Sequence, residues 1–140
     1  MFEHFETLSI RRDGPVDWLT LDRPDVLNSI NTQMVTELRE YFGSLSETLA
    51  TRIVVISGAG RAFCAGLDIE AAAVMNSKDG TAPAGGGWGF QGYLAEVYAM
   101  MRRVPQPIIS LVQGAACGGG FALALASDSR VRSGSFRHSW

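Results

Sequence analysis

Two apolar runs that each end in a small-residue turn constrain the fold of this chain most strongly. "IVVIS" (Ile53–Ser57) leads into "GAGRAFCAGLDIE", and "IISLV" (Ile108–Val112) leads into "QGAACGGG". Short apolar runs bounded by glycines, with β-branched residues inside them, predict buried strands. If the two strands are neighbours in one sheet, both turns emerge at the same edge.

The first half of the chain predicts a hairpin followed by a helix. Thr7–Arg12 and Val16–Asp22 are joined by Asp13-Gly14, a strong turn signal. Asn31 is a plausible N-cap for a helix through about Leu49. One face of this helix is expected to be buried because its apolar residues are spaced by three and four positions: Val35, Leu38, Phe42, Leu45 and Leu49.

The second half predicts a long loop and two more helices. Ala71–Gly92 is rich in Ala and Gly and has no sustained period, so a surface loop is expected. A helix follows over about Tyr93–Arg103, and "GFALALASD" predicts a tightly packed small-residue helix. Strands that alternate with helices indicate an α/β domain. The residues expected on the buried side of the Tyr93–Arg103 helix are Leu94, Val97, Tyr98 and Met101.

Composition excludes several classes of function. The chain has 140 residues, 46% of them hydrophobic, and a net charge of −2, which indicates one globular domain without an electrostatic footprint for nucleic acid or an anionic membrane. No apolar run reaches the roughly 18 residues of a membrane-spanning helix. The first residues lack the pattern of a secretory signal. Cys64 and Cys117 are therefore expected to be free thiols in a reducing cytoplasm.

Other site chemistries have weaker support. Gly58-Ala59-Gly60 follows a strand, as in a dinucleotide-binding loop, but Phe63 stands where that pattern needs glycine. Cys64, Cys117, His4 and His138 could together supply four zinc ligands. No pair among them has a short ligand spacing, so no metal site is expected. The sequence also lacks the G-x-S-x-G motif of a serine hydrolase.

The pair of small-residue turns favours a different site. The second turn opens a helix, whose first N–H groups lack intrahelical acceptors and lie at the positive end of the helix dipole. Two backbone N–H groups aimed at one point form an oxyanion hole, which stabilises negative charge developing on a carbonyl oxygen. The alternative is that the glycines serve only tight turns and close helix–strand packing.

Three blocks of the sequence resemble the enoyl-CoA hydratase/isomerase family, also called the crotonase superfamily. They are "LDRPDVLNSINTQMVTELRE", "IVVISGAGRAFCAGLDI" and "PIISLVQGAACGGGFALALASD", in the family's order and spacing. The resemblance implies a spiral of ββα units that binds acyl-CoA thioesters, with no separate cofactor because coenzyme A is part of the substrate. The full-length parent is expected to be a homotrimer or hexamer. Residues 1–130 would be an incomplete acyl-CoA-binding core, truncated before the C-terminal helical region, and 131–140 an atypical tail.

By position, the resemblance assigns roles to individual residues. The catalytic oxyanion-hole N–H groups would belong to Leu67 and Gly119. Around them, the remaining substrate-binding positions would flank the thioester and the pantetheine arm or lie near the adenine end of coenzyme A: Val26, Ala65, Gly66, Asp68, Ile69 and Gly118.

One position departs from the family pattern. Ala122 stands where a family hydratase usually carries a glutamate, and a methyl group cannot transfer a proton. Isomerisation or another enolate reaction is therefore slightly favoured over hydration, with an acid–base group beyond residue 140. Glu70, Glu96 and Asp128 are weaker candidates for proton transfer. The alternative is a catalytically inactive truncated fragment, or a partner subunit of an intact family member.

Overall fold

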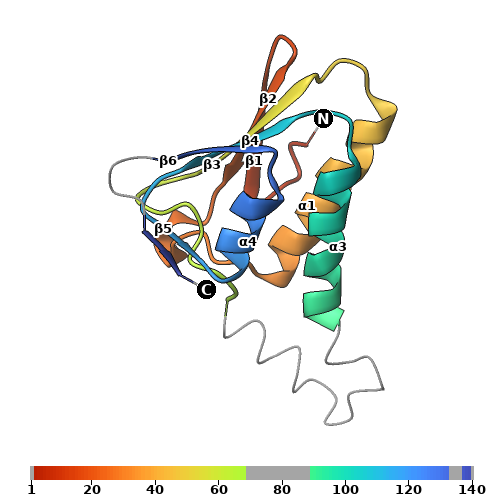
Figure 1. The fold of residues 1–140 in the computed structure, drawn as a ribbon. Helices are drawn as coiled ribbons and strands as arrows, with labels where there is room; N and C mark the ends of the chain where they lie inside the picture. Colours follow the sequence, from red (N-terminus) through yellow and green to blue (C-terminus); the bar gives the residue numbers. More distant parts are fainter. Residues whose placement is uncertain (1, 69–88, 133–136, 140) are drawn as a thin grey trace.

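A five-stranded sheet forms the centre of the computed structural model, which describes residues 2–68, 89–132 and 137–139 (Figure 1). Its strand order is β1-β2-β3-β4-β6, and β1 pairs antiparallel with β2 while the other neighbours are parallel. The strands are β1 (Leu8–Asp13), β2 (Val16–Leu21), β3 (Ile53–Gly58), β4 (Ile108–Val112) and β6 (Ser129–Arg132).

The two apolar runs are neighbouring parallel strands, as the edge argument requires. In the register of β3 and β4, Val54 lies opposite Ile108 and Ile56 lies opposite Ser110. The predicted hairpin is also confirmed, with Leu8 of β1 opposite Leu21 of β2. A second, two-stranded sheet pairs β5 (Ala115–Cys117) with β7 (Arg137–Ser139) in parallel.

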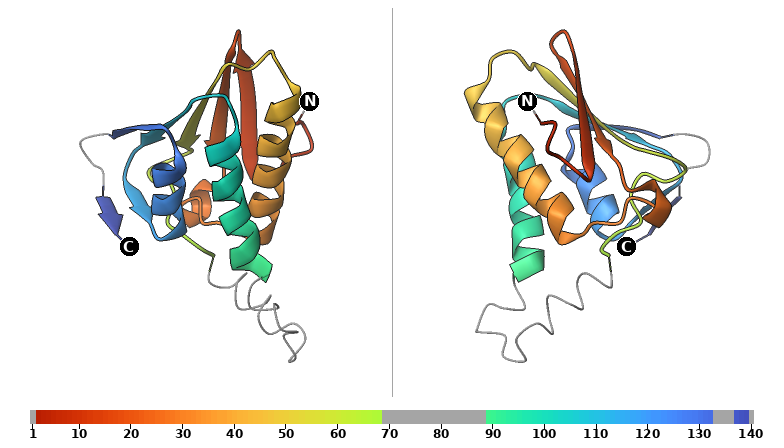
Figure 2. Two further views of the ribbon diagram at one scale, coloured as in Figure 1. Left: turned by 45° about the vertical axis from the view of Figure 1, so that its right-hand side comes forward. Right: turned by 180° about the vertical axis from the view of Figure 1, so that it is seen from behind.

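The three α-helices of the described residues lie on one side of the large sheet (Figures 1 and 2). They are α1 (Thr32–Ser44), α3 (Gly89–Arg103) and α4 (Gly119–Ala126), and α1 packs against α3. The Asn31 side chain accepts a hydrogen bond from Met34 N, which confirms the predicted N-cap. Leu94, Val97 and Met101 of α3 are buried as predicted, and Tyr98 is half-buried against the same core.

The predicted end of the first helix is wrong. α1 ends at Ser44, a 3₁₀ turn covers Leu45–Glu47, and Leu49 is 97% exposed instead of buried. The hydroxyls of Ser44 and Ser46 bond back to carbonyls of the preceding turn. Such bonds compete with regular helix, and the extended backbone at Thr48 then carries the chain away from the apolar face.

Only the last four residues of the loop predicted over Ala71–Gly92 can be compared with the structure. Residues 69–88 lie outside the described residues, whereas Gly89–Gly92 belong to α3, so that helix begins earlier than predicted. The small-residue helix is confirmed as α4. At the other end of the chain, β6 crosses residue 130, the predicted end of the core.

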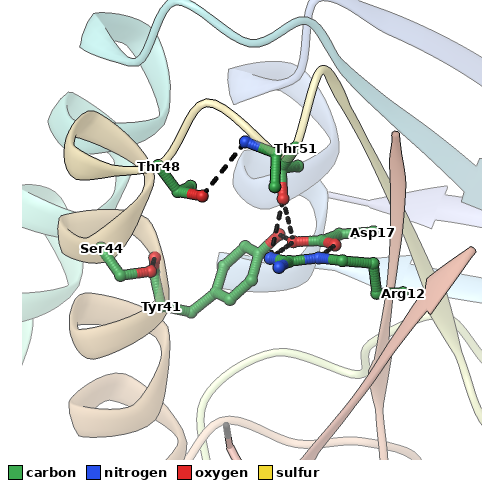
Figure 3. A network of polar contacts seen from close by, with 7 residues as sticks. Arg12, Asp17, Tyr41, Ser44, Thr48 and Thr51 are labelled. Atoms are coloured by element: carbon green, nitrogen blue, oxygen red, sulfur yellow. Dashed lines mark hydrogen bonds and ion pairs between the residues drawn. The ribbon is translucent and has the colours of Figure 1, made fainter. Parts of the chain in front are cut away.

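A buried polar network joins the hairpin to α1 (Figure 3). The side chain of Asp17 is fully buried and accepts hydrogen bonds from Arg12 Nε at 2.8 Å, Tyr41 Oη at 2.7 Å and Thr51 Oγ1 at 2.9 Å. Burial opposes ionisation of Asp17, but these donors outweigh it and hold the pKa of the carboxyl below its usual value.

Candidate functional site

The turns that follow β3 and β4 are bonded to each other. Cys64 forms a parallel bridge with Ala116, and Cys117 N donates to Cys64 O at 3.0 Å. The N–H groups of Phe63 and Cys64 both donate to Ala115 O at 3.1 Å. The two glycine-containing turns therefore meet at the same edge of the sheet, beyond the carboxyl ends of β3 and β4.

Leu67 and Gly119 lie side by side where the turns meet. A Cβ placed on Gly119 would lie 3.5 Å from Leu67 Cδ2, and a Cβ on Gly66 would lie 3.9 Å from Gly119 N. Gly66 itself has a φ of +107°, and its N–H faces the Cys64 thiol. The structure thus brings together the two residues whose N–H groups the sequence singles out.

The backbone around Leu67 directs its N–H outward. Ile30 N donates to Gly66 O, and Asp68 N donates to Ile30 O, both at 2.8 Å. Because residues on either side of Leu67 face Ile30, the N–H of Leu67 points away from Ile30. Within residues 2–68, 89–132 and 137–139, no backbone oxygen accepts a hydrogen bond from it.

Gly118, the residue before α4, has a backbone conformation that residues with side chains rarely adopt. Gly118 has φ +50° and ψ −118°, and its carbonyl accepts from Ala122 N at 3.0 Å. Gly119 is the first residue of the helix, so its N–H has no intrahelical acceptor. This N–H also has no backbone acceptor among the described residues, and it lies at the positive end of the α4 dipole.

Gly120 lets the first turn of α4 lie directly against the turn that follows β3. A Cβ at Gly120 would lie 2.5 Å from Cys64 Cβ and 2.8 Å from Cys64 Sγ, and closer still to the Cys64 carbonyl oxygen. Burial raises the pKa of the Cys64 thiol to about 12, so the group stays protonated at neutral pH. Cys64 is therefore a buried side chain that packs against the two turns.

Tyr98 reaches the same place from α3. Its hydroxyl donates to Gly119 O at 2.9 Å and would lie 3.4 Å from a Cβ on Gly119. Burial raises the pKa of Tyr98 well above its usual value, so the hydroxyl remains a donor. The sequence shows Tyr98 only as one member of an apolar helix face, and nothing local indicates its bond to Gly119.

Asp68 is paired rather than free. Arg23 Nη1 lies 3.2 Å from Asp68 Oδ2 and donates to Ser29 O at 2.7 Å. Val26 is 44% exposed in the 3₁₀ turn Pro24–Val26, and Ala65 N donates to Leu27 O at 2.9 Å. The segment that carries Val26 is thereby bonded to the turn that carries Leu67. Ile69, the remaining predicted substrate-binding residue, lies outside the described residues.

Asn28 fixes this segment, and the sequence analysis missed it. Its φ is +57°, and its buried amide donates to Ala59 O and Ala62 O, both at 2.9 Å. Its Oδ1 accepts from Arg23 N at 2.8 Å. Asparagine adopts the left-handed backbone conformation more readily than most other residues with side chains. An asparagine in this turn was therefore the sequence signal that could have identified the position.

The candidate proton-transfer residues have other partners. Glu96 is exposed and pairs with Arg39 at 3.4 Å, and Asp128 accepts a hydrogen bond from Ile108 N at 2.8 Å. Glu70 lies outside the described residues. Among the weighed metal ligands, His4 bonds to Glu40 at 3.0 Å. In the part of the chain that the structure describes, no group of three or more His, Cys, Asp or Glu side chains lies close enough together to hold a metal ion. None of the described helices is long and apolar enough to cross a membrane.

Comparison with known proteins gives consistent matches. The family model described as enoyl-CoA hydratase/isomerase matches residues 11–137. A probable enoyl-CoA hydratase of Mycobacterium tuberculosis is 38% identical over 84% of this chain and 41% of its own length. The carnitinyl-CoA dehydratase of Salmonella arizonae is 40% identical over 88% of this chain and 44% of its own.

Solved structures agree with these matches. An enoyl-CoA hydratase/isomerase from Marinobacter aquaeolei superposes with a TM-score of 0.88 at 31% identity, covering 94% of this chain and 50% of that one. The chain therefore spans less than half the length of the two relatives named above and half the length of this structure.

Proposed function

Because this chain belongs to the enoyl-CoA hydratase/isomerase family, with its mixed α/β fold, we propose that it forms the acyl-CoA-binding half of an enzyme that stabilises a thioester enolate. The N–H groups of Leu67 and Gly119 are the proposed oxyanion hole. Isomerisation or another enolate reaction is slightly favoured over hydration, because Ala122 offers no carboxylate.

One observation carries the proposal, namely the meeting of the two turns at the edge of the sheet. Leu67 and Gly119 come from turns more than 50 residues apart, yet a Cβ on Gly119 would contact the Leu67 side chain at 3.5 Å. Neither N–H group has a backbone hydrogen-bond acceptor among the described residues. Two such donors and a helix N-terminus supply what a developing oxyanion requires.

The proposed chemistry depends on charge that develops during the reaction. Removal of a proton from the carbon next to the thioester carbonyl moves negative charge onto the carbonyl oxygen. Donors that are already in place stabilise this enolate more than they stabilise the neutral thioester, which lowers the barrier. The base and acid that move the proton are proposed to lie beyond residue 140.

The remaining proposals concern the substrate and the assembly. Gly66, Ala65 and Gly118 border the two donors and would flank the thioester and pantetheine arm, as would Asp68 and Ile69. Val26 would lie near the adenine end of coenzyme A. The proposed reaction needs no cofactor, because coenzyme A arrives with the substrate. The full-length parent is proposed to be a cytoplasmic homotrimer or hexamer.

A second candidate function is a catalytically inactive fragment or a partner subunit of an intact family member. The observation that favours it is Ala122, since the first turn of α4 then offers no acid or base. This candidate and the first differ in whether the chain alone binds a thioester through its carbonyl.

Thermal unfolding with matched ligands tests the proposal. The ligands are an acyl-CoA thioester, the alkyl-CoA thioether of the same length, which lacks the carbonyl, and free coenzyme A. Each hydrogen bond to the carbonyl contributes about 0.5–1.5 kcal/mol, so we expect the thioester to bind about tenfold more tightly than the thioether. Tighter binding appears as a larger increase in Tm at equal ligand concentration.

The other outcomes separate the two candidates. Equal shifts with thioester and thioether would contradict the oxyanion hole, because the carbonyl would then contribute nothing. A chain without a cooperative transition, or one that none of the three ligands stabilises, would favour the inactive fragment.

A further inference from the structure

We infer that Tyr98 is a positioning residue for the site, whose hydroxyl fixes the peptide of Gly119 and thereby holds the first turn of α4 in the geometry that polarises the thioester. This inference rests on the proposed function of Leu67 and Gly119. It adds a residue on α3 that contacts the donor glycine from outside its own turn.

The hydrogen bond from Tyr98 is additional to those of the helix. Gly119 O lies in the first turn of α4, where the regular pattern gives it the N–H four residues later as a partner. Tyr98 Oη donates to the same oxygen at 2.9 Å across 21 residues of sequence. Because the carbonyl has two lone pairs, it can accept both bonds.

The glycines of this turn need a contact from another element, like the Tyr98 hydrogen bond, to hold them in place. Gly118, Gly119 and Gly120 have no side chains that could pack the turn in place, and Gly118 has nothing within 4 Å of its Cβ position. Ala122 N holds Gly118 O, and Cys64 backs Gly120. Tyr98 supplies the corresponding restraint on the Gly119–Gly120 peptide.

The hydroxyl keeps this role over a wide range of pH. Burial disfavours the phenolate, so Tyr98 stays an uncharged donor. Its ring packs against the hydrophobic core, to which Val97 of the same helix belongs. A hydroxyl held by a rigid helix fixes the Gly119–Gly120 peptide, which adjoins the Gly118–Gly119 peptide that carries the proposed donor N–H. Preorganised donors are what an oxyanion hole requires.

Ile30, Leu67 and the Tyr98 hydroxyl all lie next to Gly119. A Cβ on Gly119 would lie 3.3 Å from Ile30 Cδ1, 3.4 Å from Tyr98 Oη and 3.5 Å from Leu67 Cδ2. Of these three nearest atoms, the Tyr98 hydroxyl is the polar one, and the other two are apolar.

The test compares Tyr98→Phe with Tyr93→Phe in the 140-residue chain. Tyr93 lies on the same helix, is 48% exposed and stacks beneath Arg39, so its substitution changes the same atom away from the site. The probe is a CoA thioester of an aryl-conjugated 2-enoic acid, whose absorption moves to longer wavelength when donors polarise its carbonyl. Free coenzyme A serves as the ligand without a carbonyl.

We expect Tyr98→Phe to lose most of this spectral shift and to bind the thioester about threefold to tenfold more weakly. Its affinity for free coenzyme A should stay within about twofold of that of the unchanged chain, on the same grounds. Tyr93→Phe should match the unchanged chain in all three measurements. A purely structural role for Tyr98 would not weaken the spectral shift selectively.

The opposing outcomes are distinct. If Tyr98→Phe keeps the full shift and affinity, the inference about Tyr98 is overturned while the proposed function stands. If the unchanged chain produces no shift, the proposed function fails, and the inference fails with it.

A second measurement applies if Tyr98→Phe does not fold. Site-specific 3-fluorotyrosine at position 98 keeps the ring and the hydroxyl but makes the hydroxyl a stronger donor. A change in the bound thioester's absorption relative to natural tyrosine, absent with 3-fluorotyrosine at position 93, supports the inference. An unchanged spectrum overturns it.

Discussion

The three glycines at the start of α4 have different surroundings. Gly118 has open space around its Cβ position but a φ of +50°, so only its backbone conformation favours glycine. A Cβ added to Gly119 would contact only the ends of neighbouring side chains. Gly120 has no room, because Cys64 fills the position of its Cβ. Sequence alone does not distinguish these cases, since all three are the same letter.

Gly120→Ala should destabilise the chain strongly. The added methyl would overlap the backbone and side chain of Cys64, which cannot move without displacing the strand bridge to Ala116. Overpacking of this kind costs about 1–3 kcal/mol in the free energy of unfolding, and backbone contacts place it toward the upper end. Urea denaturation followed by circular dichroism measures the change.

Gly43→Ala is the matched control. Gly43 lies inside α1, and its Cβ position meets only Met100 Cε at 3.4 Å. Alanine is a better helix former than glycine by about 1 kcal/mol, so this variant should be as stable as the unchanged chain or more stable. Equal stability of the two alanine variants would contradict the close approach of Gly120 to Cys64.

At the scale of elements, buried polar side chains connect segments that local patterns leave unconnected. Asp17 on β2 accepts hydrogen bonds from β1, from α1 and from the segment before β3 (Figure 3). Glu37 on α1 similarly accepts from the backbone N–H groups of Glu6, Thr7 and Leu8. These carboxylates hold α1 against the hairpin in a defined orientation.

Asp17→Asn should lower the free energy of unfolding by about 1–3 kcal/mol at pH 7, because a charge-assisted pair is replaced by weaker bonds. The folded-state pKa of Asp17 lies below the unfolded value of about 3.9, so its ionised form stabilises the fold above that pH. This contribution disappears as the pH falls through the folded-state pKa. The difference between the two proteins should therefore shrink below about pH 4.

Chemical denaturation at pH 7 and at pH 3 measures both values. Asp13→Asn on the same hairpin is the control, since the Asp13 side chain is 72% exposed and its pair with Arg11 has an N–O distance of 4.0 Å. This change should cost no more than about 0.5 kcal/mol at either pH. A difference for Asp17→Asn that stays constant with pH would contradict the role of its charge.

Local signals predicted the elements better than the contacts between them. Short apolar runs and the Asp13-Gly14 turn predicted β3, β4 and the hairpin, and the paired small-residue turns predicted that the two turns meet. Leu67 and Gly119 were singled out within those turns by the family resemblance. The bonds of Tyr98 to Gly119 and of Arg23 to Asp68 join residues 21 and 45 positions apart. A single sequence carries no periodic or capping signal for such pairs.

At the scale of the whole molecule, the large sheet has an exposed edge at β6. Only β4 is its neighbour among the described strands, and its four residues are all exposed. Val131 is 56% exposed and lies beside the half-buried Leu111 of β4. An apolar residue on an unpaired edge strand favours pairing with another chain.

We therefore expect the chain to self-associate through this edge, and Val131→Lys to weaken the association. A lysine removes the apolar contact and places like charges opposite each other, which should raise the concentration for half-association by about tenfold. Sedimentation velocity over a range of protein concentrations measures this midpoint. Leu49→Lys makes the same change of charge at a residue that is 97% exposed and lies outside the sheet, so it should leave the midpoint unchanged. If both variants shift the midpoint equally, net charge rather than the β6 edge governs association.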